Sequence, residues 1–390
     1  MRDGAIGGRS VRLLYAIEDR YPPFRADVVE LFAHELPRRG FQIDWMMRRG
    51  PQAMHEPTRI TWNGQHVWLS PATARRGLPG RVANAMLGAW GDLRMLGRAW
   101  RGRYDVIQVR DRAVLGLWAW VVSRLTGARF VFWMSYPYAE SKLDQARQGF
   151  VPRPTLTRFK GRFIGWVLYR LVLPRADHVF VQSQRMKDDV ARQGVDPGRM
   201  TPVPMGIRAD QVGQPSDARA PDPVQPLLLY LGIILRLRQT EMLVDVLHRV
   251  RRRYPGARLR YVGEGLHASD RKAIEDAAER LGLRDAVEIT GFLPMEQAWQ
   301  HVKEADVCFS PFQPIPVLQS TSPTKLVEYM AMAKCIVANH HPEQTPMMVA
   351  SGVGRTVDWD AGAFAEAVCA VIDSEEAAAT ADCPGTAQRH

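Results

Sequence analysis

Short apolar runs alternate with amphipathic stretches along the first 50 residues. Val11–Ile17 is almost continuously apolar, as expected of a strand that is buried in a parallel sheet. Asp27–Arg39 carries apolar residues at helical spacing, and Phe41–Met46 predicts a second strand. A strand, a helix and a strand at this spacing predict a βαβ unit. Because ligands of open α/β sheets bind beyond the strand ends, the loop Glu18–Arg25 is a candidate wall of a site.

The same alternation continues to about residue 207. Asn63-Gly64 predicts a β-hairpin turn. The strand expected at Asp105–Val109 ends in Arg110-Asp111-Arg112, and the strand expected at Arg129–Met134 is followed by a loop with Glu140. The other elements expected in this half are helices at Leu78–Trp100, Val114–Leu125, Phe159–Leu173 and Gln184–Gln193 and a strand at Asp177–Gln182.

A second alternating region follows a change in composition. Residues 209–226 are rich in Pro, Asp, Gln and Ala, which predicts a linker. Residues 374–390 are small and polar and are predicted to be disordered. We therefore predict an α/β protein with two doubly wound domains, residues 1–208 and 227–373. The second domain should contain strands at Pro226–Leu231, Arg258–Val262, Val287–Thr290 and Val307–Ser310 and helices at Thr240–Tyr254, Asp270–Leu281, Met295–Glu304 and Ala361–Ile372.

The stretch Gln319–Gln344 is predicted to form a loop, a helix, a strand and a loop. Ser322 suits the N-cap of the helix and Pro323 its first position. Cys335–Ala338 is short and apolar, as a buried strand should be.

The start of this helix concentrates groups that can hold a phosphate. Free backbone N–H groups, several hydroxyls and the cation Lys325 would converge there. Lys325 opposes the helix dipole, so it has little structural reason to lie in the first turn. Glu328, one turn further on, could accept hydrogen bonds from sugar or ribose hydroxyls. The alternative is a capped helix with a surface lysine and a half-buried glutamate. The hydroxyl residues are Ser320, Thr321, Ser322 and Thr324.

This stretch resembles the donor-site segment of GT-B glycosyltransferases, specifically the large retaining family 4 (glycosyl transferases group 1). That family carries a Glu-x7-Glu pattern before a helix of small residues and a short strand. Glu328 matches the second glutamate, whereas Ser320 stands at the position of the first. The resemblance implies two Rossmann-like domains that face a central cleft. It also implies that Glu328 binds the ribose of a nucleotide sugar, with Ser320 to Lys325 along the diphosphate and the sugar.

Other parts of the second half fit the same resemblance. In the family, a Gly-Arg…Lys-Gly pattern binds the diphosphate. Arg238 matches the lysine of this pattern, whereas Ile233 stands at the position of the arginine. Arg236 could take the role of that arginine. Guanidinium groups bind phosphate oxygens well. Gly232 precedes these residues, and Gly263 permits a close approach of the backbone. Phe292 and Leu293 match the family's nucleobase pocket.

Charge is unevenly spread along the chain. The formal net charge is +11, but residues 1–208 hold 34 Lys and Arg against 17 Asp and Glu, whereas the remainder holds 18 against 24. The basic half indicates an anionic membrane surface, nucleic acid or an anionic substrate. A nucleic-acid recognition motif is missing from the sequence, so we do not expect nucleic acid as a partner. Phe159–Leu173 mixes aromatic and basic residues and predicts either a membrane-surface helix or a buried one.

The acceptor side is less specified by the sequence. Glu18, Arg110, Asp111 and Glu140 follow predicted strands and could bind an acceptor hydroxyl, although solvated loop residues are the alternative. The four cysteines show no CxxC spacing, which favours reduced thiols over disulfides or a metal site. No apolar signal region or membrane-spanning run is visible, so we expect a cytoplasmic protein, peripheral on the inner membrane face if it binds a membrane.

We therefore predict a retaining transferase that moves a hexosyl or related group from a nucleoside diphosphate sugar to a saccharide or lipid-linked hydroxyl. Arg236, Arg238 and Lys325 would stabilise the leaving diphosphate, so no metal or other cofactor is expected. Exopolysaccharide, cell-envelope or glycolipid synthesis would use such a reaction. The alternatives are a non-catalytic GT-B partner subunit and a sugar-nucleotide epimerase or phosphorylase of the same fold.

Overall fold

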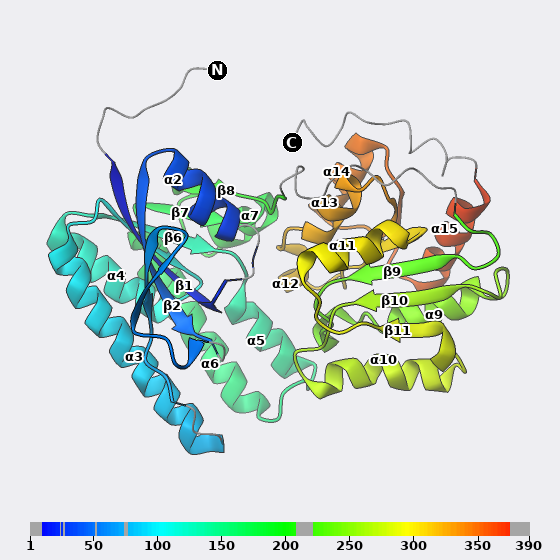
Figure 1. Ribbon diagram of the computed structural model, residues 1–390, viewed down its shortest axis with the longest axis horizontal. Helices are drawn as coiled ribbons and strands as arrows, with labels where there is room; N and C mark the ends of the chain where they lie inside the picture. Colours follow the sequence, from blue (N-terminus) through cyan, green and yellow to red (C-terminus); the bar gives the residue numbers. More distant parts are fainter. Residues whose placement is uncertain are drawn as a thin grey trace. The chain divides into compact units, whose positions relative to one another are not determined.

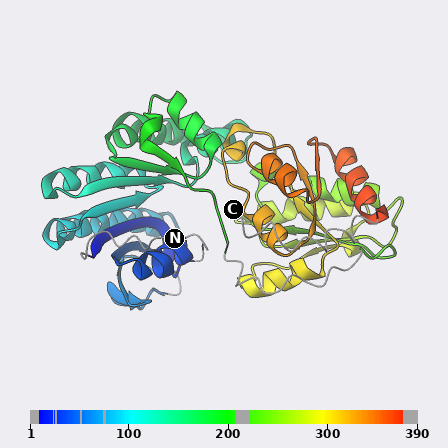
Figure 2. The ribbon, with the colours of Figure 1, turned by 90° about the horizontal axis from the view of Figure 1, so that it is seen from above.

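The computed structural model describes residues 10–23, 25, 28–50, 53–73, 77–207 and 221–374, and its contacts divide the chain into two compact domains between Pro204 and Met205. Each domain holds one largely parallel sheet with helices on both faces (Figures 1 and 2). This architecture confirms the predicted pair of doubly wound α/β domains. Most of the predicted linker, residues 208–220, and the predicted tail from residue 375 lie outside the described residues.

The N-terminal domain has the strand order β3-β4-β2-β1-β5-β6-β7-β8, and β3 pairs antiparallel with β4 in the predicted hairpin. Asn63 and Gly64 both have positive φ angles, as the two-residue turn of this hairpin requires. The strands are β1 (Val11–Tyr21), β2 (Phe41–Arg49), β3 (Arg59–Trp62), β4 (Gln65–Leu69), β5 (Val106–Arg110), β6 (Arg129–Met134), β7 (His178–Val181) and β8 (Met200–Pro202). The helices are η1 (Val29–Glu35), α2 (Leu36–Arg38), α3 (Gly77–Gly102), α4 (Ala113–Thr126), α5 (Tyr138–Arg147), α6 (Pro154–Trp166), η3 (Val167–Val172), η4 (Leu173–Arg175), α7 (Gln184–Arg192) and η5 (Pro197–Arg199).

The C-terminal domain has the strand order β11-β10-β9-β12-β13-β14, and all its strand pairs are parallel. The strands are β9 (Leu227–Leu231), β10 (Arg258–Val262), β11 (Val287–Ile289), β12 (Val307–Ser310), β13 (Cys335–Asn339) and β14 (Arg355–Val357). The helices are η6 (Arg236–Arg238), α9 (Met242–Val250), α10 (Ala268–Arg280), η7 (Arg284–Ala286), α11 (Met295–Glu304), α12 (Pro316–Gln319), α13 (Thr324–Ala331), α14 (Gln344–Ser351) and α15 (Ala361–Asp373).

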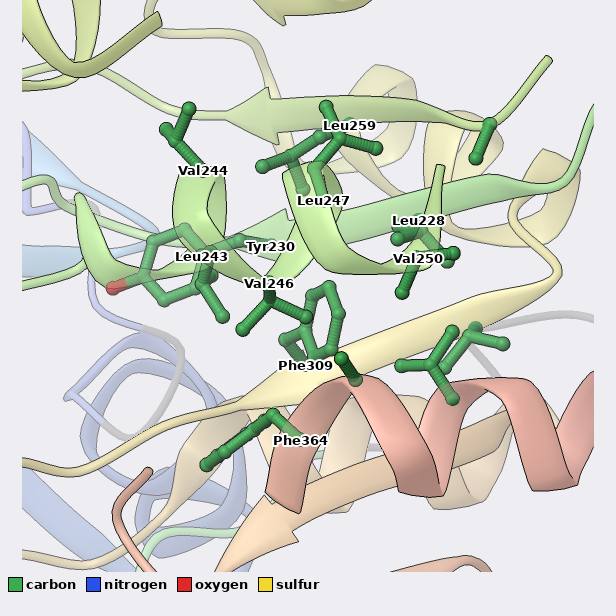
Figure 3. Packing of buried hydrophobic residues seen from close by; sticks show 14 of the residues in the cluster. Leu228, Tyr230, Leu243, Val244, Val246, Leu247, Val250, Leu259, Phe309 and Phe364 are labelled. Carbon is green, nitrogen blue, oxygen red and sulfur yellow. The ribbon is translucent and has the colours of Figure 1, made fainter. Parts of the chain in front are cut away.

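The central strand β9 is buried on both faces, which explains its unbroken apolar sequence. Leu228 and Tyr230 face one core with α9, α10 and α15, and Figure 3 shows them with residues of α9 and α15. Leu229 and Leu231 face the other core, which α11, α13 and α14 cover. Because the side chains of β9 alternate between two faces that helices cover, β9 can meet a ligand only at its carboxyl end.

Two predicted helices differ from the structure. The helix predicted at Asp27–Arg39 is described from Val28 and is a π-helix over Val29–Glu35, because Pro37 lacks an N–H group and the chain bonds from Leu36 back to Leu31 instead. The helix predicted at Phe159–Leu173 is two pieces, an exposed α6 and a buried η3.

Candidate functional site

The C-terminal domain has its topological switch point between β9 and β12. From β9 the chain continues to β10 on one side, whereas β12 lies against β9 on the other side. Loops after these two strands therefore diverge and leave a crevice, where open α/β sheets bind their ligands. Gly232 follows β9 directly, and Pro311-Phe312 follows β12.

Gly232 and Gly263 bring the loops after β9 and β10 into contact. A Cβ atom on Gly263 would lie 2.2 Å from the carbonyl oxygen of Gly232, and the φ angle of Gly263 is +149°. The Gly232 N–H donates to Val262 O at 2.9 Å. The close backbone approach predicted for Gly263 therefore occurs, and it is made to the neighbouring loop.

Lys325 is buried at this crevice between two aromatic rings. Its Nζ lies 5.1 Å from the ring centre of Tyr230 and 4.9 Å from that of Phe312. Burial lowers the pKa of Lys325 well below its ordinary value, the nearby Arg238 lowers this pKa further, and Glu328 opposes the shift. The alternative of a surface lysine is therefore wrong.

Arg238 reaches the same point from the turn η6. A Cβ atom on Gly232 would lie 3.7 Å from Lys325 Cε and 3.9 Å from Arg238 Nη1. Arg238 Nη1 also lies 3.4 Å from the Tyr230 hydroxyl and from Ile233 O. Two like charges held this close favour an anion as a third partner.

Arg236 starts the same turn, and its backbone is tied to α10. Its backbone N–H donates to Asp270 Oδ1 at 3.1 Å, and the Asp270 carboxylate also accepts from His267 N at the start of α10. The structure thus brings Arg238, Lys325, Gly232 and Gly263 together, and it places Arg236 beside α10.

Glu328 lies one turn after Lys325 and is also buried. Trp299 Nε1 donates to its Oε1 at 3.2 Å. Burial raises the pKa of Glu328 to about 7, while the Trp299 hydrogen bond and Lys325 lower it. The carboxyl group therefore changes its charge near neutral pH, and the alternative of a half-buried glutamate is wrong.

The hydroxyls before α13 are tied to their own loop. Ser320 Oγ donates to Pro316 O at 3.0 Å, and Thr321 Oγ1 donates to Leu318 O at 2.6 Å. The predicted cap by Ser322 is wrong: α13 begins at Thr324 after Pro323, and Ser322 Oγ accepts from Met205 N at 3.0 Å. The helix therefore begins one residue later than predicted.

The two predicted nucleobase residues differ in exposure. Phe292 is 64% exposed, whereas Leu293 is half-buried against the core under α11 and α13. Only Phe292 therefore has a face that is open to stacking with a base.

The N-terminal domain has a cavity of its own at the equivalent switch point, where β1 lies between β2 and β5. Its volume is about 510 Å³, and its walls are mostly apolar. Two predicted acceptor residues line it, Glu18 and Asp111. The apolar lining residues are Ala89, Leu93, Ala113, Val114, Leu115, Trp118 and Ile164, and the other polar ones are Arg48, Asp92, Arg112, Tyr138 and Lys142.

A compensated ion network forms one wall of this cavity. Arg112 Nε lies 3.0 Å from Glu18 Oε2, and Arg112 is also hydrogen-bonded to Asp92. Arg48 lies 3.8 Å from Glu18 and 3.7 Å from Asp92. Two cations thus alternate with two anions, which leaves this wall formally neutral.

Asp111 lines the cavity beside the network, and Arg110 is its buried neighbour. Asp111 is buried with a positive φ, and its Oδ1 accepts from Ser135 N at 2.7 Å. Burial raises the pKa of Asp111, against the effect of Arg110. The Arg110 guanidinium lies under the Trp133 ring, 5.1 Å from its centre, inside the domain.

Glu140 has a structural contact. It lies in the first turn of α5, and its Oε1 accepts from the Tyr169 hydroxyl at 2.7 Å. Burial raises the pKa of Tyr169, and Glu140 raises it further. Glu140 is outside the lining of the cavity, as is Arg110.

Comparisons with known proteins agree with this geometry. A profile of the glycosyl transferase 4-like domain matches residues 26–206, and one of glycosyl transferases group 1 matches residues 225–374. The chain belongs to the group 1 glycosyltransferases of GT-B fold. No curated protein sequence matches the chain significantly.

Solved structures share the fold of this glycosyltransferase at low sequence identity. Sucrose-phosphate synthase from Thermosynechococcus elongatus has 17% identity and a TM-score of 0.70, with coverage of 96% of this chain and 92% of that chain. WaaG, a glycosyltransferase involved in lipopolysaccharide biosynthesis, has 15% identity and a TM-score of 0.68, with coverage of 94% and 93%. HepE from Anabaena, in complex with UDP, has 15% identity and a TM-score of 0.64, with coverage of 95% and 93%.

Sequence reasoning missed the polar residues that hold the crevice of the glycosyltransferase. Asn339 Oδ1 accepts from Phe312 N at 2.7 Å, and its Nδ2 donates to Phe312 O at 2.8 Å. Gln344 Nε2 donates to Asn339 O at 2.7 Å. This pairing fixes Phe312, which covers one side of Lys325. The signal available in the sequence was the run of polar residues directly after a buried strand.

Tyr329 is a further residue that the sequence did not single out. Its hydroxyl accepts from Leu231 N at 2.8 Å, just beyond the paired part of β9 and β12. The phenol therefore replaces a strand partner where the two strands separate. Among the described residues, no group of three metal-ligating side chains is present, and none of the described helices is long and apolar enough to cross a membrane.

Proposed function

We propose that the protein transfers a hexosyl group from a nucleoside diphosphate sugar to a hydroxyl of an acceptor, with retention of configuration at the anomeric carbon. The observation that carries this proposal is that Lys325 and Arg238 both approach the point where a side chain on Gly232 would begin, at the switch point. Two adjacent cations with glycine backbone beside them suit a diphosphate, because the phosphate oxygens neutralise both.

In the reaction, the bond between the anomeric carbon and a phosphate oxygen breaks. The acceptor oxygen bonds to the same face of that carbon, and its proton passes to the departing diphosphate. Lys325 and Arg238 stabilise the charge that develops on the leaving group, and Arg236 would add to it from the start of η6. Because side chains supply this charge, we propose that the reaction needs no metal or other cofactor, and turnover should persist in excess EDTA.

The remaining donor residues divide by their contacts. Glu328 would accept from the ribose hydroxyls, and Phe292 would stack on the base above Leu293. Ser322 and Thr324 are half-buried at the start of α13 and are available to the phosphates and the sugar. Ser320 and Thr321 donate their hydroxyls to backbone carbonyls, so they would shape the loop rather than bind the sugar.

We place the acceptor in the cavity of the N-terminal domain. Glu18 and Asp111 line it, whereas Arg110 and Glu140 would support its walls through Trp133 and Tyr169. Mostly apolar walls with a charged rim suit an amphiphilic, lipid-linked acceptor better than a free sugar. Such an acceptor belongs to exopolysaccharide, cell-envelope or glycolipid synthesis, and it would require a cytoplasmic enzyme that reaches an anionic membrane surface.

The first test is thermal unfolding with UDP, GDP, ADP and their sugar conjugates. HepE, which has the same fold, is described in complex with UDP, so UDP is the first nucleotide to try. A ligand at 100 times its dissociation constant stabilises the folded state by about 2.7 kcal/mol. Stabilisation by one base, abolished in Lys325→Met and kept in Lys272→Met, would support the proposal. The absence of stabilisation by every nucleotide would contradict it.

A non-catalytic partner of another transferase is the second candidate. One observation favours it: Ser320, at the position of the family's first glutamate, donates its hydroxyl to Pro316 O and brings no carboxylate to the sugar. This candidate predicts nucleotide binding without turnover over a range of acceptors, and Ser320→Glu would then be the variant to assay.

A further inference from the structure

Helix α6 exposes an apolar stripe in the described part of the N-terminal domain. Leu156, Phe159, Phe163 and Trp166 follow one another at intervals of three or four residues, so they lie along one side of the helix. Each is between 43% and 69% exposed. A stripe with three large aromatic side chains has a hydrophobic reason to be covered.

The charged residues of α6 are all cationic. Arg158, Lys160 and Arg162 are exposed, and the sequence Pro154–Trp166 contains no acidic residue. A cavity of about 330 Å³ lies between α5 and α6, lined by Leu143, Arg147, Arg158 and Arg162. Arg147 lies 3.3 Å from Asp144, which is one carboxylate against three guanidinium groups. The charge of this cavity suits an anion such as a phosphate group.

The helix is held firmly enough to present this surface. A Cβ atom on Gly161 would lie 3.1 Å from Ala139 O and from Leu143 Cδ2, so the glycine lets α6 approach α5 more closely than a larger residue would. Beyond Trp166 the chain continues into η3, whose Val167, Leu168 and Val172 are buried in the core. The stripe is thus attached at its side and at its end.

The stripe lies beside the cavity to which we assign the acceptor. Ile164 of α6 lines that cavity together with Leu93 of α3 and Trp118 of α4. Leu93 and Trp118 also belong to the exposed apolar side chains of their helices. Apolar surface therefore continues from α6 to the mouth of the acceptor cavity.

We propose that α6 lies on an anionic phospholipid bilayer, with its apolar stripe in the interface and a lipid phosphate in the cavity between α5 and α6. The charge of this surface is complementary to anionic lipid, and exposed aromatic residues beside cations are typical of interfacial helices. The binding to the bilayer is argued from α6 alone. Its role, which is to bring a lipid-linked acceptor to the cavity at Ile164, rests on the proposed function.

The experiment is sedimentation of the full chain with vesicles of phosphatidylcholine alone or with 30% phosphatidylglycerol. We expect binding only to the anionic vesicles, weakening as the salt concentration rises. The double variant Arg158→Gln, Arg162→Gln should lower the partition coefficient roughly 30-fold, because each cation near an anionic surface contributes about fivefold. Phe159→Ser with Phe163→Ser should lower it at least about tenfold.

Matched controls change the same residue types elsewhere. Leu266→Ser with Val349→Ser removes exposed apolar side chains, and Lys272→Gln with Arg284→Gln removes exposed cations, all in the C-terminal domain. These variants should bind vesicles like the parent chain, and all variants should keep its melting temperature.

Three outcomes would overturn the inference. They are binding that the α6 variants leave unchanged, binding of soluble glycerol phosphate without binding of vesicles, and concentration-dependent self-association that α6 variants abolish without vesicle binding. A failure of the proposed function would show separately, because nucleotide stabilisation is measured without lipid.

Discussion

The two domains place different chemistry at the same point of the same topology. At the switch point of the C-terminal domain, Lys325 and Arg238 lie close together, and the burial of Lys325 depresses its pKa. At that of the N-terminal domain, Arg48 and Arg112 alternate with Glu18 and Asp92 in a neutral network beside an apolar cavity.

Net charge does not reveal this difference. The N-terminal half carries the large positive surplus, yet its site is compensated, whereas the slightly acidic C-terminal half holds the two adjacent cations. An anion site depends on like charges held together out of solvent, and overall charge describes only the surface. We therefore expect the cations at the C-terminal switch point to bind a ligand and those at the N-terminal switch point to stabilise the fold.

The largest expected effect is on turnover. Lys325→Met keeps the apolar stem between the rings of Tyr230 and Phe312 and removes the charge. It should lower kcat roughly 10²- to 10³-fold, as the loss of one group that stabilises a leaving charge does. Assays of sugar transfer at saturating donor would measure this, with the exposed Lys272→Met as the control. Equal rates in the two variants would remove Lys325 from the mechanism.

The next largest effect is expected on stability, from the glycine contact between the loops after β9 and β10. Gly263→Ala would place a methyl group 2.2 Å from Gly232 O at a φ of +149°, so we expect a loss of about 3–4 kcal/mol in the free energy of unfolding. Gly282→Ala, at a φ of +67° with no atom within 4 Å of its Cβ, should cost only about 1 kcal/mol. Urea titration of both variants compares them. Similar losses of stability in the two variants would mean that the two loops can move apart to accommodate the added methyl group.

The pH dependence of stability should carry the signature of Glu328. Its pKa is raised from 4.5 to about 7, so the folded state binds a proton that the unfolded state has lost. This contribution to stability is complete below about pH 4.5 and is lost as the pH rises to about 7, roughly 3 kcal/mol in all.

The variant that tests this dependence is Glu328→Gln, which should flatten the decline in stability between pH 5 and pH 7. Lys325 works in the opposite sense: its lowered pKa makes the unfolded state bind more protons, so its contribution to stability rises with pH above its folded pKa. Chemical denaturation at several pH values separates the two. A parent chain whose stability is level from pH 5 to pH 7 would contradict the Glu328 assignment.

The smallest effect is expected in the N-terminal network. Arg112→Gln leaves Glu18 and Asp92 with Arg48 alone, and because Glu18 is about half exposed, the loss should be about 2 kcal/mol. Arg238→Gln should not destabilise the protein without ligand, since it removes one of two like charges. If both arginines stabilise their domains equally, the contrast drawn between the two sites is wrong.

Much of the fold could be predicted because short stretches of the sequence determine its strands and turns. Apolar runs predicted the buried strands, and Asn63-Gly64 predicted the hairpin. The exceptions have local causes too. Pro37 converts a predicted α-helix into a π-helix, and α13 begins one residue later than expected, at Thr324 after Pro323.

The site could be predicted only in part. Lys325 stood out as a cation that opposes the helix dipole and Arg238 as a match to the family pattern, and the structure brings the two together. The rings around Lys325 could not be predicted, because Tyr230 lies in β9 and Phe312 in the loop after β12, and they meet only through the pairing of these two strands. The alternation that buries Tyr230 gave it the pattern of an ordinary core residue.

The hydrogen bond from Leu231 N to the Tyr329 hydroxyl also limits how the donor site can be re-engineered. Tyr329 is attached to the same helix as Lys325 and Glu328, so any insertion within Lys325–Tyr329 would rotate the two charged groups away from the crevice or detach the phenol from the sheet. Changes of donor selectivity therefore have to leave the spacing within α13 intact.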